Sequence, residues 1–323
     1  MRFALMIEPQ QGLSYAEQLA IARTAEAAGF EALLRSDHFA SFPGAAGLRT
    51  TDALTVLAGL ARETTRLRLG VLVAPITFRL PGTFAKAAAT LDEMSDGRAE
   101  IGLGAGWNEL EHDGLGIPFP PLGERIDRLE EALAIVHGLW TEPDGWSFEG
   151  RYWQLHDSRF GPRPTSAAGR RHPHLIVGGT GKPRGLRLAA LYADEYNLSS
   201  VELETVPGVR ANLRAACAAV GRDPDTVVFS AMVGVLVGES AGDVRDRVRA
   251  QLKMLGMADR DGAAWLDDRR SRWVIGTPEQ AQERIAQYGR AGVQRVALQD
   301  FLPRDLAMIR LIGARLLADG AGL

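Results

Sequence analysis

Short apolar runs alternate along the chain with longer segments in which apolar residues recur at helical spacing. Apolar runs of about four to eight residues that end in turn residues are typical of buried strands. Eight strands are predicted in this way, and they span Phe3–Ile7, Ala32–Arg35, Leu67–Val73, Glu100–Leu103, Leu175–Val177, Glu195–Leu198, Val227–Val235 and Arg295–Leu298. Because helical segments separate these runs, the pattern predicts an α/β protein.

Two of the predicted helices begin with a capping box. Ser14 pairs with Glu17, and Thr277 pairs with Gln280, so that each side chain satisfies a backbone donor at the start of its helix. Pro278 occupies the first helical position after the second cap, where proline is favoured. The other predicted helices span about Asp52–Glu63, Pro81–Met94, Leu122–Leu139, Pro183–Leu191, Leu203–Val220 and Arg304–Leu317.

Four glycines mark points where a helix gives way to a strand: Gly29, Gly97, Gly169 and Gly292. Glycine after a helix adopts the left-handed conformation that ends it. Repeated helix-to-strand steps indicate parallel strands, and strand–helix alternation eight times over predicts a closed (β/α)8 TIM barrel. A doubly wound parallel sheet is the alternative, because alternation does not by itself close the sheet.

Two segments interrupt the alternation, at about residues 141–173 and 240–273. The first carries aromatic residues among Pro and Gly, and it is either a lid or wall of a binding site or a small core of its own. The second combines a helix with a charged stretch and is expected to lie over the barrel rim. We therefore expect residues 1–323 to form a single barrel domain with two insertions.

Charge and cysteine content exclude several functions. A net charge of −3 gives no electrostatic basis for binding nucleic acid or an anionic membrane. Cys217 is the only cysteine, so neither an intrachain disulfide nor a thiolate metal cluster can form. The sequence has no apolar run of about 18 residues, no signal-peptide pattern and no three ligands at metal spacing. We expect a cytoplasmic protein with no metal site.

Polar and glycine residues follow two of the predicted strands, and in a TIM barrel such positions lie at the catalytic rim. Asp37 and His38 follow the second strand, where an imidazole could act as acid, base or hydrogen-bond donor. The alternative is that these two residues are a polar pair in a loop with no catalytic or binding role. Gly104 and Gly106 follow the fourth strand and would let a flat ligand approach the backbone, but they do not have the helix spacing of a dinucleotide fingerprint.

A glycine-rich loop follows the fifth strand and comprises Gly178, Gly179, Thr180 and Gly181. Exposed amides and the positive end of the helix that follows predict an anion site, to which Lys182 and Arg184 would add charge. The alternative is that the glycines only permit a tight turn.

Five segments are each common alone, but together in this order they are specific for one protein family: Gly29–His38, Leu69–Arg79, Leu91–Arg98 with Gly102–Asn108, Ile176–Gly181, and Thr277–Gln280. With them, nearly the whole chain resembles the luciferase-like monooxygenase family, in its branch that uses the deazaflavin coenzyme F420. The resemblance implies a TIM barrel, a coenzyme at the carboxyl ends of its strands, and a homodimer.

The resemblance also implies how the coenzyme is held. Its ring would lie against a bulge after the third strand, where such proteins carry a non-prolyl cis peptide, here at or near Val71–Leu72. The glycine-rich loop would hold its phosphate tail. The implied coenzyme-binding residues are Asp37, His38, Val71, Leu72, Ala74, Ala105, Gly106, Gly178, Gly179, Thr180 and Gly181.

The branch includes alcohol and sugar-phosphate dehydrogenases in which a histidine corresponding to His38 removes the hydroxyl proton while the coenzyme takes a hydride. Those dehydrogenases have a Glu where this chain has Trp107, and a Trp near the position of Phe42. The chain therefore departs from the sugar-phosphate enzymes. Glu109 or His112 could replace the missing acid, and Glu109 is the second catalytic candidate.

The expected function is hydride transfer between F420 and a small organic substrate, in either direction. An FMN-dependent monooxygenase of the same fold, supplied by a separate reductase, is the nearest alternative. A catalytically silent coenzyme-binding homologue is the alternative from another class.

Overall fold

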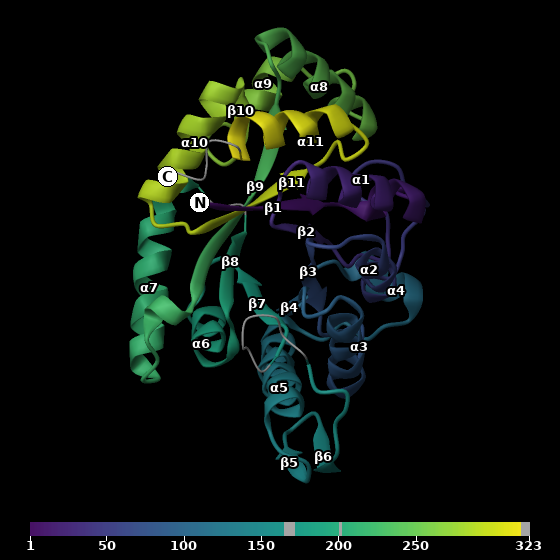
Figure 1. Cartoon of the computed structure of the whole chain (residues 1–323), viewed down its shortest axis with the longest axis vertical. Coiled ribbons are helices and arrows are strands. Elements are labelled where there is room, and N and C mark those ends of the chain that lie inside the picture. Colours follow the sequence, from purple (N-terminus) through teal and green to yellow (C-terminus); the bar gives the residue numbers. More distant parts are fainter. Residues whose placement is uncertain (165–171, 200–201, 318–323) are drawn as a thin grey trace.

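The apolar runs of the sequence form one closed parallel sheet (Figure 1). The computed structural model describes residues 1–164, 172–199 and 202–317. The barrel strands are β1 (Arg2–Ile7), β2 (Ala32–Arg35), β3 (Arg68–Pro75), β4 (Ala99–Gly104), β7 (His174–Gly179), β8 (Glu195–Ser199), β9 (Val228–Val237) and β11 (Arg295–Asp300). Because β8 also pairs with β9, the two ends of the sheet are joined. The predicted TIM barrel is confirmed, and the doubly wound sheet is wrong.

Helices connect the strands and surround the barrel. They are α1 (Tyr15–Ala27), α2 (Ala53–Glu63), α3 (Pro81–Met94), α4 (Glu109–Leu115), α5 (Leu122–Thr141), α6 (Pro183–Tyr192), α7 (Val206–Ala219), α8 (Ala241–Met254), α9 (Gly262–Asp267), α10 (Pro278–Arg290) and α11 (Leu306–Ile312). A short strand, β10 (Val274–Gly276), pairs with β9 outside the barrel. The predicted helices are confirmed, except that the one predicted from Leu203 begins with a separate 3-10 turn.

The local signals in the sequence act as predicted. Ser14 Oγ accepts the Glu17 backbone N–H at 3.2 Å, and the Glu17 side chain accepts the Ser14 N–H at 2.7 Å. Three of the four marker glycines have left-handed φ angles, of 88°, 78° and 95° at Gly29, Gly97 and Gly292. The fourth, Gly169, lies outside the described residues.

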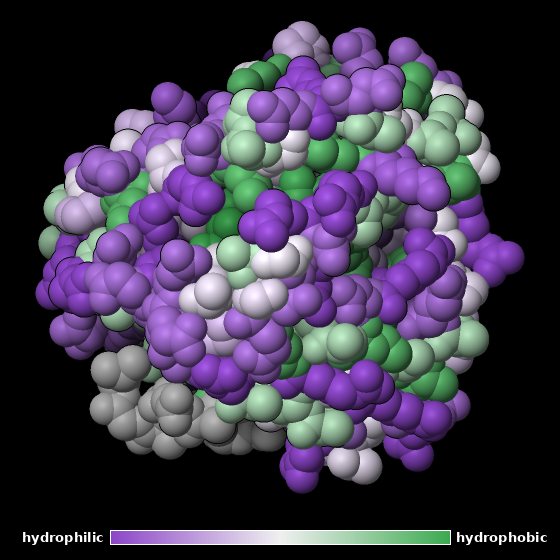
Figure 2. Space-filling model, turned by 90° about the horizontal axis from the view of Figure 1, so that it is seen from above, coloured by the Kyte–Doolittle hydropathy of each residue, from purple (hydrophilic) through white to green (hydrophobic). Residues whose placement is uncertain are grey.

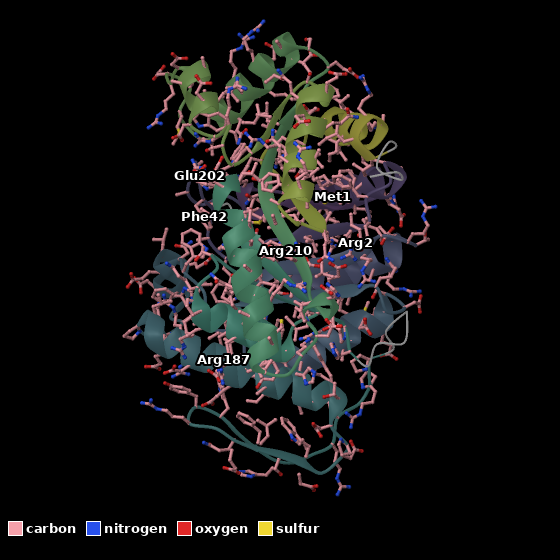
Figure 3. The ribbon with its side chains drawn as sticks, turned by 90° about the vertical axis from the view of Figure 1, so that its left-hand side faces the viewer. Met1, Arg2, Phe42, Arg187, Glu202 and Arg210 are labelled. Atoms are coloured by element: carbon pink, nitrogen blue, oxygen red, sulfur yellow. The ribbon has the colours of Figure 1, made fainter. Side chains whose placement is uncertain are left out.

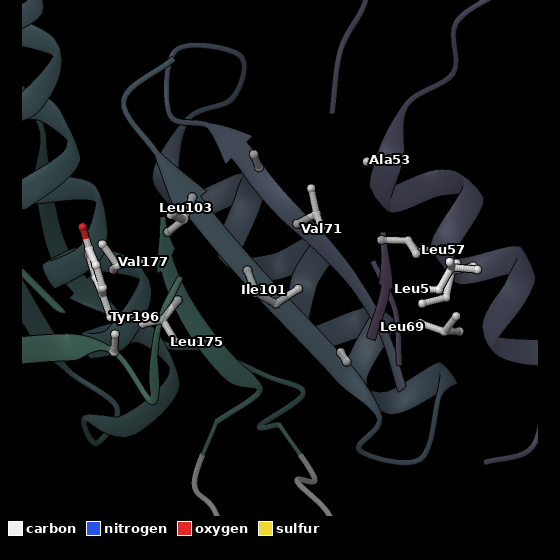
Figure 4. Close-up of a cluster of buried hydrophobic side chains, with 14 of the residues drawn as sticks. Leu5, Ala53, Leu57, Leu69, Val71, Ile101, Leu103, Leu175, Val177 and Tyr196 are labelled. Atoms are coloured by element: carbon white, nitrogen blue, oxygen red, sulfur yellow. The ribbon is translucent and has the colours of Figure 1, made fainter. Parts of the chain in front are cut away.

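Alternate strand residues face opposite sides of the barrel wall. One set faces the helices and forms the main core, as Figure 4 shows for Leu69, Val71, Ile101, Leu103, Leu175 and Val177. The other set fills the barrel interior and consists of Ala4, Met6, Ala32, Leu34, Leu72, Ile176 and Ala297. The barrel is thus a filled core, and ligands can enter only at its ends.

Buried charges close the amino-terminal end of the barrel. Arg295 Nη1 lies 2.8 Å from a Glu100 oxygen and 2.9 Å from a Glu195 oxygen, and all three side chains are almost fully buried. Burial by itself would raise the pKa of Glu100, but the Arg295 and His174 charges outweigh it and lower the pKa to about 2. His174 bonds Glu195 at 2.9 Å in the same cluster, so this histidine is structural.

Asp300 ends β11 in a fully buried position and makes stability depend on pH. Burial raises the pKa of Asp300 from 3.8 to about 7. Between these values the folded chain keeps the proton and the unfolded chain has lost it, so stability falls as the pH rises from about 4 to about 7. Asp300→Asn removes this loss. We expect the variant to be more stable than the parent at pH 8 by about 2–4 kcal/mol, and nearly equal at pH 4, in urea unfolding.

Asp259→Asn is the matched control for this prediction, because Asp259 is exposed. It should leave the pH dependence of unfolding unchanged. Parallel stability curves for Asp300→Asn and the parent between pH 4 and pH 8 would contradict the prediction.

The first insertion packs against α5. Strands β5 (Trp146–Glu149) and β6 (Gln154–Ser158) form an antiparallel hairpin at one end of the long axis of the molecule (Figure 1). The Trp146 ring occupies the space beside Gly138 of α5, and Phe160 is buried. Phe160 belongs to the main core, and Trp146 and Phe148 pack against it, so the described residues of this segment extend the main core and do not form a small core of their own.

The second insertion lies at the opposite end of the long axis, where α8 and α9 are found (Figure 1). It reaches the barrel rim through Trp273, whose ring stacks on Phe301 just after β11 at a centroid distance of 5.3 Å. This contact agrees with the expected position over the rim.

The surface seen from the α8 and α9 end is mostly hydrophilic, with scattered hydrophobic residues (Figure 2). None of the helices in the described part of the chain combines the length and the apolar character needed to cross a membrane. Exposed large apolar side chains gather instead within residues 107–122, at Trp107, Leu110, Leu115 and Leu122.

Candidate functional site

A cavity of about 500 Å³ opens at the carboxyl-terminal ends of the strands, within the usual range for small-molecule sites. Figure 3 shows the two barrel ends: Phe42 and Glu202, which follow β2 and β8, lie on one side, and Met1 and Arg2, where β1 begins, lie on the other. Each barrel strand, or the loop directly after it, contributes to the lining, through Met6, Ser36, Leu72, Gly104, Gly178, Ser199, Met232 and Gln299. A larger groove, of about 860 Å³, lies between α8 and α11, outside the barrel.

His38 lines the cavity and is paired with a buried carboxylate. Its Nδ1 lies 2.9 Å from Glu111 Oε1, on the first turn of α4. Because a carboxylate only accepts hydrogen bonds, this contact places the ring hydrogen on Nδ1 and leaves Nε2 as the acceptor in the neutral ring. Nε2 has no hydrogen-bond partner among the described residues, so it is available to a ligand.

The Glu111 carboxylate is itself held by backbone groups. Its Oε2 accepts the Phe39 N–H at 2.9 Å and the Ala40 N–H at 3.4 Å. The loop after β2 and helix α4 are therefore joined at one carboxylate, which fixes the orientation of the His38 ring.

Two aromatic side chains flank the His38 ring. The ring centroids of Phe42 and Trp107 lie 4.5 Å and 5.7 Å from that of His38, both in edge-on geometry. Phe42 and Trp107 also meet each other edge-on at 5.3 Å. Such edge-to-face contacts are the favoured arrangement of aromatic rings, and they form an apolar wall beside the imidazole.

A bulge in β3 forms another wall. The Leu72–Val73 peptide is cis, and the pairing of β3 with β4 shifts register at this point. The bulge brings Val73 against β4 and β7, where an added Cβ at Gly104 or Gly178 would lie 2.6 Å or 2.9 Å from the Val73 side chain. The bulge itself therefore requires these two glycines.

The glycine-rich loop begins within the last two residues of β7, and three of its residues line the cavity: Gly178, Gly179 and Thr180. The fourth does not, because the Gly181 N–H donates to the Tyr196 hydroxyl at 2.7 Å. The φ angle of Gly181 is 82°, which favours glycine. The loop contains a tight turn and also presents backbone to the cavity, so both interpretations stay open.

The two cations beside this loop differ. Arg184 Nη2 pairs with Asp127 at 2.5 Å, so its charge is largely compensated. Lys182 is the exposed N-cap residue of α6 and forms no ion pair with any described residue. The positive end of α6 and the Lys182 charge therefore favour an anion here.

A hydrogen-bonded polar group lines another part of the cavity. Glu8 accepts from Gln10 Nε2 at 2.7 Å and from Gln299 Nε2 at 2.5 Å, and Ser36 Oγ donates to Gln10 Oε1 at 2.7 Å. All four residues are buried. Because their side chains satisfy one another, they form a fixed polar surface at the barrel mouth.

Comparison with known proteins decides the family. Residues 1–295 match the model of the luciferase-like monooxygenase family. The chain belongs to this family.

Named relatives of this luciferase-like protein use two coenzymes. It is 34% identical to the F420-dependent glucose-6-phosphate dehydrogenase of Intrasporangium calvum, over 54% of this chain and 51% of that protein. It is 26% identical to the FMNH2-dependent dimethylsulfone monooxygenase of Pseudomonas putida, over 87% of this chain and 82% of that protein. Four relatives that are 32–34% identical, the dehydrogenase of Intrasporangium calvum among them, match over 46–60% of their own length.

A solved structure agrees with the luciferase-like fold. An F420-dependent secondary alcohol dehydrogenase, in complex with an F420–acetone adduct, superposes with a TM-score of 0.82 at 20% identity over 98% of both chains. At this identity the likeness shows the fold alone.

The luciferase-like barrel brings most of the predicted site residues to one cavity. The non-prolyl cis peptide is present at Leu72–Val73, within one residue of its expected place. The predicted residues that line the cavity are His38, Leu72, Ala105, Gly106, Gly178, Gly179 and Thr180.

The other predicted coenzyme residues do not line the cavity. Asp37 does not line it and forms an ion pair with Arg79, because neighbouring side chains on an extended backbone point apart. Val71 and Ala74 are fully buried in the main core, and Gly181 is engaged with Tyr196. None of the described residues of the two insertions lines the cavity either.

The acid next to His38 is Glu111, which the sequence analysis missed. Glu109 is exposed, and His112 is buried, with its Nε2 2.7 Å from Thr77 Oγ1. Neither contacts His38. Glu109 and Glu111 lie on different faces of α4, and no sequence signal shows which face meets the loop after β2.

Glu111→Gln is predicted to lower turnover by about 10–100-fold with little change in coenzyme affinity. The Gln amide would donate to Nδ1 and move the ring hydrogen to Nε2, which could then no longer accept a proton. Steady-state rates across pH check this, with Asp113→Asn on the exposed face of α4 as the control. A loss of turnover in Glu109→Gln but not in Glu111→Gln would contradict the assignment.

Proposed function

We propose that this protein transfers a hydride between the deazaflavin coenzyme F420 and a small organic substrate in the cavity. Members of its family are oxidoreductases, and the relatives named above depend on F420 or FMNH2. The observation that carries the proposal is the His38–Glu111 pair at the cavity wall, 2.9 Å apart, with Nε2 unpartnered among the described residues. An imidazole oriented in this way can exchange a proton with a substrate oxygen.

The cavity fits a flat ring that carries a phosphate tail. Leu72 at the bulge and the backbone at Gly106 provide two walls without polar side chains, and both line the space. Thr180 and the amino end of α6, with Lys182 beside them, would hold the phosphate. The residues therefore match the coenzyme in shape and in charge.

When bound, the coenzyme supplies the carbon that accepts a hydride from the substrate carbon. His38 Nε2 takes the hydroxyl proton in the same reaction, so that an alcohol becomes a carbonyl compound. Glu111 stabilises the imidazolium that forms, because its carboxylate is bonded to Nδ1. In the reverse direction His38 returns the proton to the carbonyl oxygen.

An FMN-dependent monooxygenase is the second candidate. It is supported by the match to the dimethylsulfone monooxygenase, which covers 87% of this chain. An F420-dependent glucose-6-phosphate dehydrogenase of Microbacterium testaceum covers 91% of this chain, so coverage does not separate the two candidates. In that case a separate reductase would supply FMNH2. A silent homologue is disfavoured, because the His38–Glu111 pair is intact.

Titration of the protein with F420 and with FMN, followed by fluorescence, separates the two candidates. We expect submicromolar binding of F420 and binding of FMN that is at least about tenfold weaker. Tight binding of FMN with no binding of F420 would replace the first candidate by the second.

Thr180→Asp is predicted to weaken F420 binding by about 10–100-fold, because the new carboxylate would repel the coenzyme phosphate beside the end of α6. Thr180→Asn has nearly the same shape without the charge and should change affinity by less than about threefold. The same titration measures both. Equal affinities for the two variants would show that the loop does not hold an anion.

A further inference from the structure

The cavity wall beside His38 is apolar and lacks cations. Phe42 and Trp107 flank the imidazole, and Leu122, at the start of α5, also lines the cavity. No Lys or Arg is found among the described residues that line the cavity. The ionisable side chains that do line it are His38 and two carboxylates, Glu8 and Glu111.

A substrate anion would find no counter-ion in this cavity. Phosphate and carboxylate groups are normally recognised by Arg or Lys, and an unpaired charge is costly to bury. Arg79, in the loop after β3, does not line the cavity, and its guanidinium is bonded to Asp37 and Asp52. Lys182 and the end of α6 are assigned to the coenzyme phosphate. Glu8 and Glu111 would repel an anion.

The same wall leaves apolar surface uncovered at the mouth of the cavity. Trp107 is 66% exposed and Leu122 is 59% exposed, although both line the cavity. Clustered exposed apolar surface at a cavity is typical of a site for an apolar ligand.

We infer that the substrate is an uncharged, largely apolar alcohol or carbonyl compound. Its oxygen lies at His38 Nε2, and its apolar body packs against Phe42, Trp107 and Leu122. Sugar phosphates and carboxylated substrates are excluded by charge. This inference rests on the proposed function for the hydride chemistry, but the selectivity of the wall is a property of these side chains alone.

Calorimetric titration of the F420-loaded protein tests the inference without a catalytic assay. The probes are α-methylbenzyl alcohol and its para-carboxylate analogue, which share the ring and the secondary hydroxyl and differ by one negative charge. We expect the neutral alcohol to bind at least about tenfold more tightly. Trp107→Ala should weaken binding of the neutral alcohol by about tenfold and change F420 affinity by less than about threefold.

A matched pair of variants isolates the charge. Leu122→Lys should strengthen binding of the carboxylate by about three- to tenfold relative to Leu122→Gln, because it supplies the missing cation at an exposed position. The inference would be overturned if the parent bound the carboxylate as tightly as the neutral alcohol or more tightly, or if it bound neither probe. Either result would leave F420 binding and the proposed function unaffected. If the protein does not bind F420, the same titration is made on the coenzyme-free protein, and preference for the neutral probe there would support the wall selectivity and refute the proposed function.

Discussion

Replacing His38 with Ala is expected to lower turnover by roughly 10²–10⁴-fold, the range for loss of a positioned general base. His38 Nε2 is the acceptor that the Glu111 contact at 2.9 Å leaves free, and no other imidazole lines the cavity among the described residues. Coenzyme affinity should stay within about tenfold of the parent, because the backbone walls and the glycine-rich loop are unchanged. Single-turnover rates of F420 reduction by a neutral alcohol measure the effect.

His38→Gln is the control for this prediction, because it keeps a polar side chain that cannot take up a proton. It should lose as much activity as His38→Ala. Added imidazole should restore part of the activity of His38→Ala, since Glu111 remains to orient it. Unchanged turnover in either variant would remove His38 from the mechanism.

Arg295→Met is expected to destabilise the fold by about 3–5 kcal/mol, the cost of breaking a buried ion pair. Arg295 is 1% exposed and bonds Glu100 and Glu195 across the barrel interior, so its removal leaves two buried carboxylates short of a counter-charge. Urea unfolding at pH 7 measures the loss. Arg295 lowers the pKa of Glu100 from 4.5 to about 2, so the stability that this ion pair contributes is lost as the pH falls through that range. The difference in unfolding free energy between Arg295→Met and the parent should therefore become smaller in acid.

Arg304→Met provides the comparison for this prediction. Arg304 pairs with Glu17 at 2.6 Å, but both side chains are well exposed, so the cost should not exceed about 1 kcal/mol. Equal losses of unfolding free energy in Arg295→Met and Arg304→Met would show that the buried cluster stabilises the fold no more than an exposed ion pair does.

The fold could be predicted from the sequence because its signals are local. The apolar run Ala32–Arg35 coincides with β2, and Pro81–Met94 coincides with α3. Gly29 ends α1 in the left-handed conformation, as a glycine after a helix predicts. The number of strand–helix steps favoured a closed barrel without requiring it, and the β8–β9 pairing confirms the closure.

The site was predicted only in part because it depends on contacts between distant segments. His38 could be found from its place after a strand, but its partner Glu111 lies 73 residues away, on a helix that the periodicity did not predict. Asp37 and Gly181 look like ligand residues in the sequence, yet Arg79 and Tyr196 engage them within the protein. A homodimer and a cytoplasmic location remain predictions.

A crystal structure of the protein grown with F420 tests the central claim most directly. We predict that the deazaflavin ring occupies the cavity between the Leu72–Val73 peptide and Gly106, with His38 Nε2 free to reach the substrate and the phosphate at Thr180. Coenzyme bound in the groove between α8 and α11, or bound in the cavity with its phosphate away from the glycine-rich loop, would contradict this account.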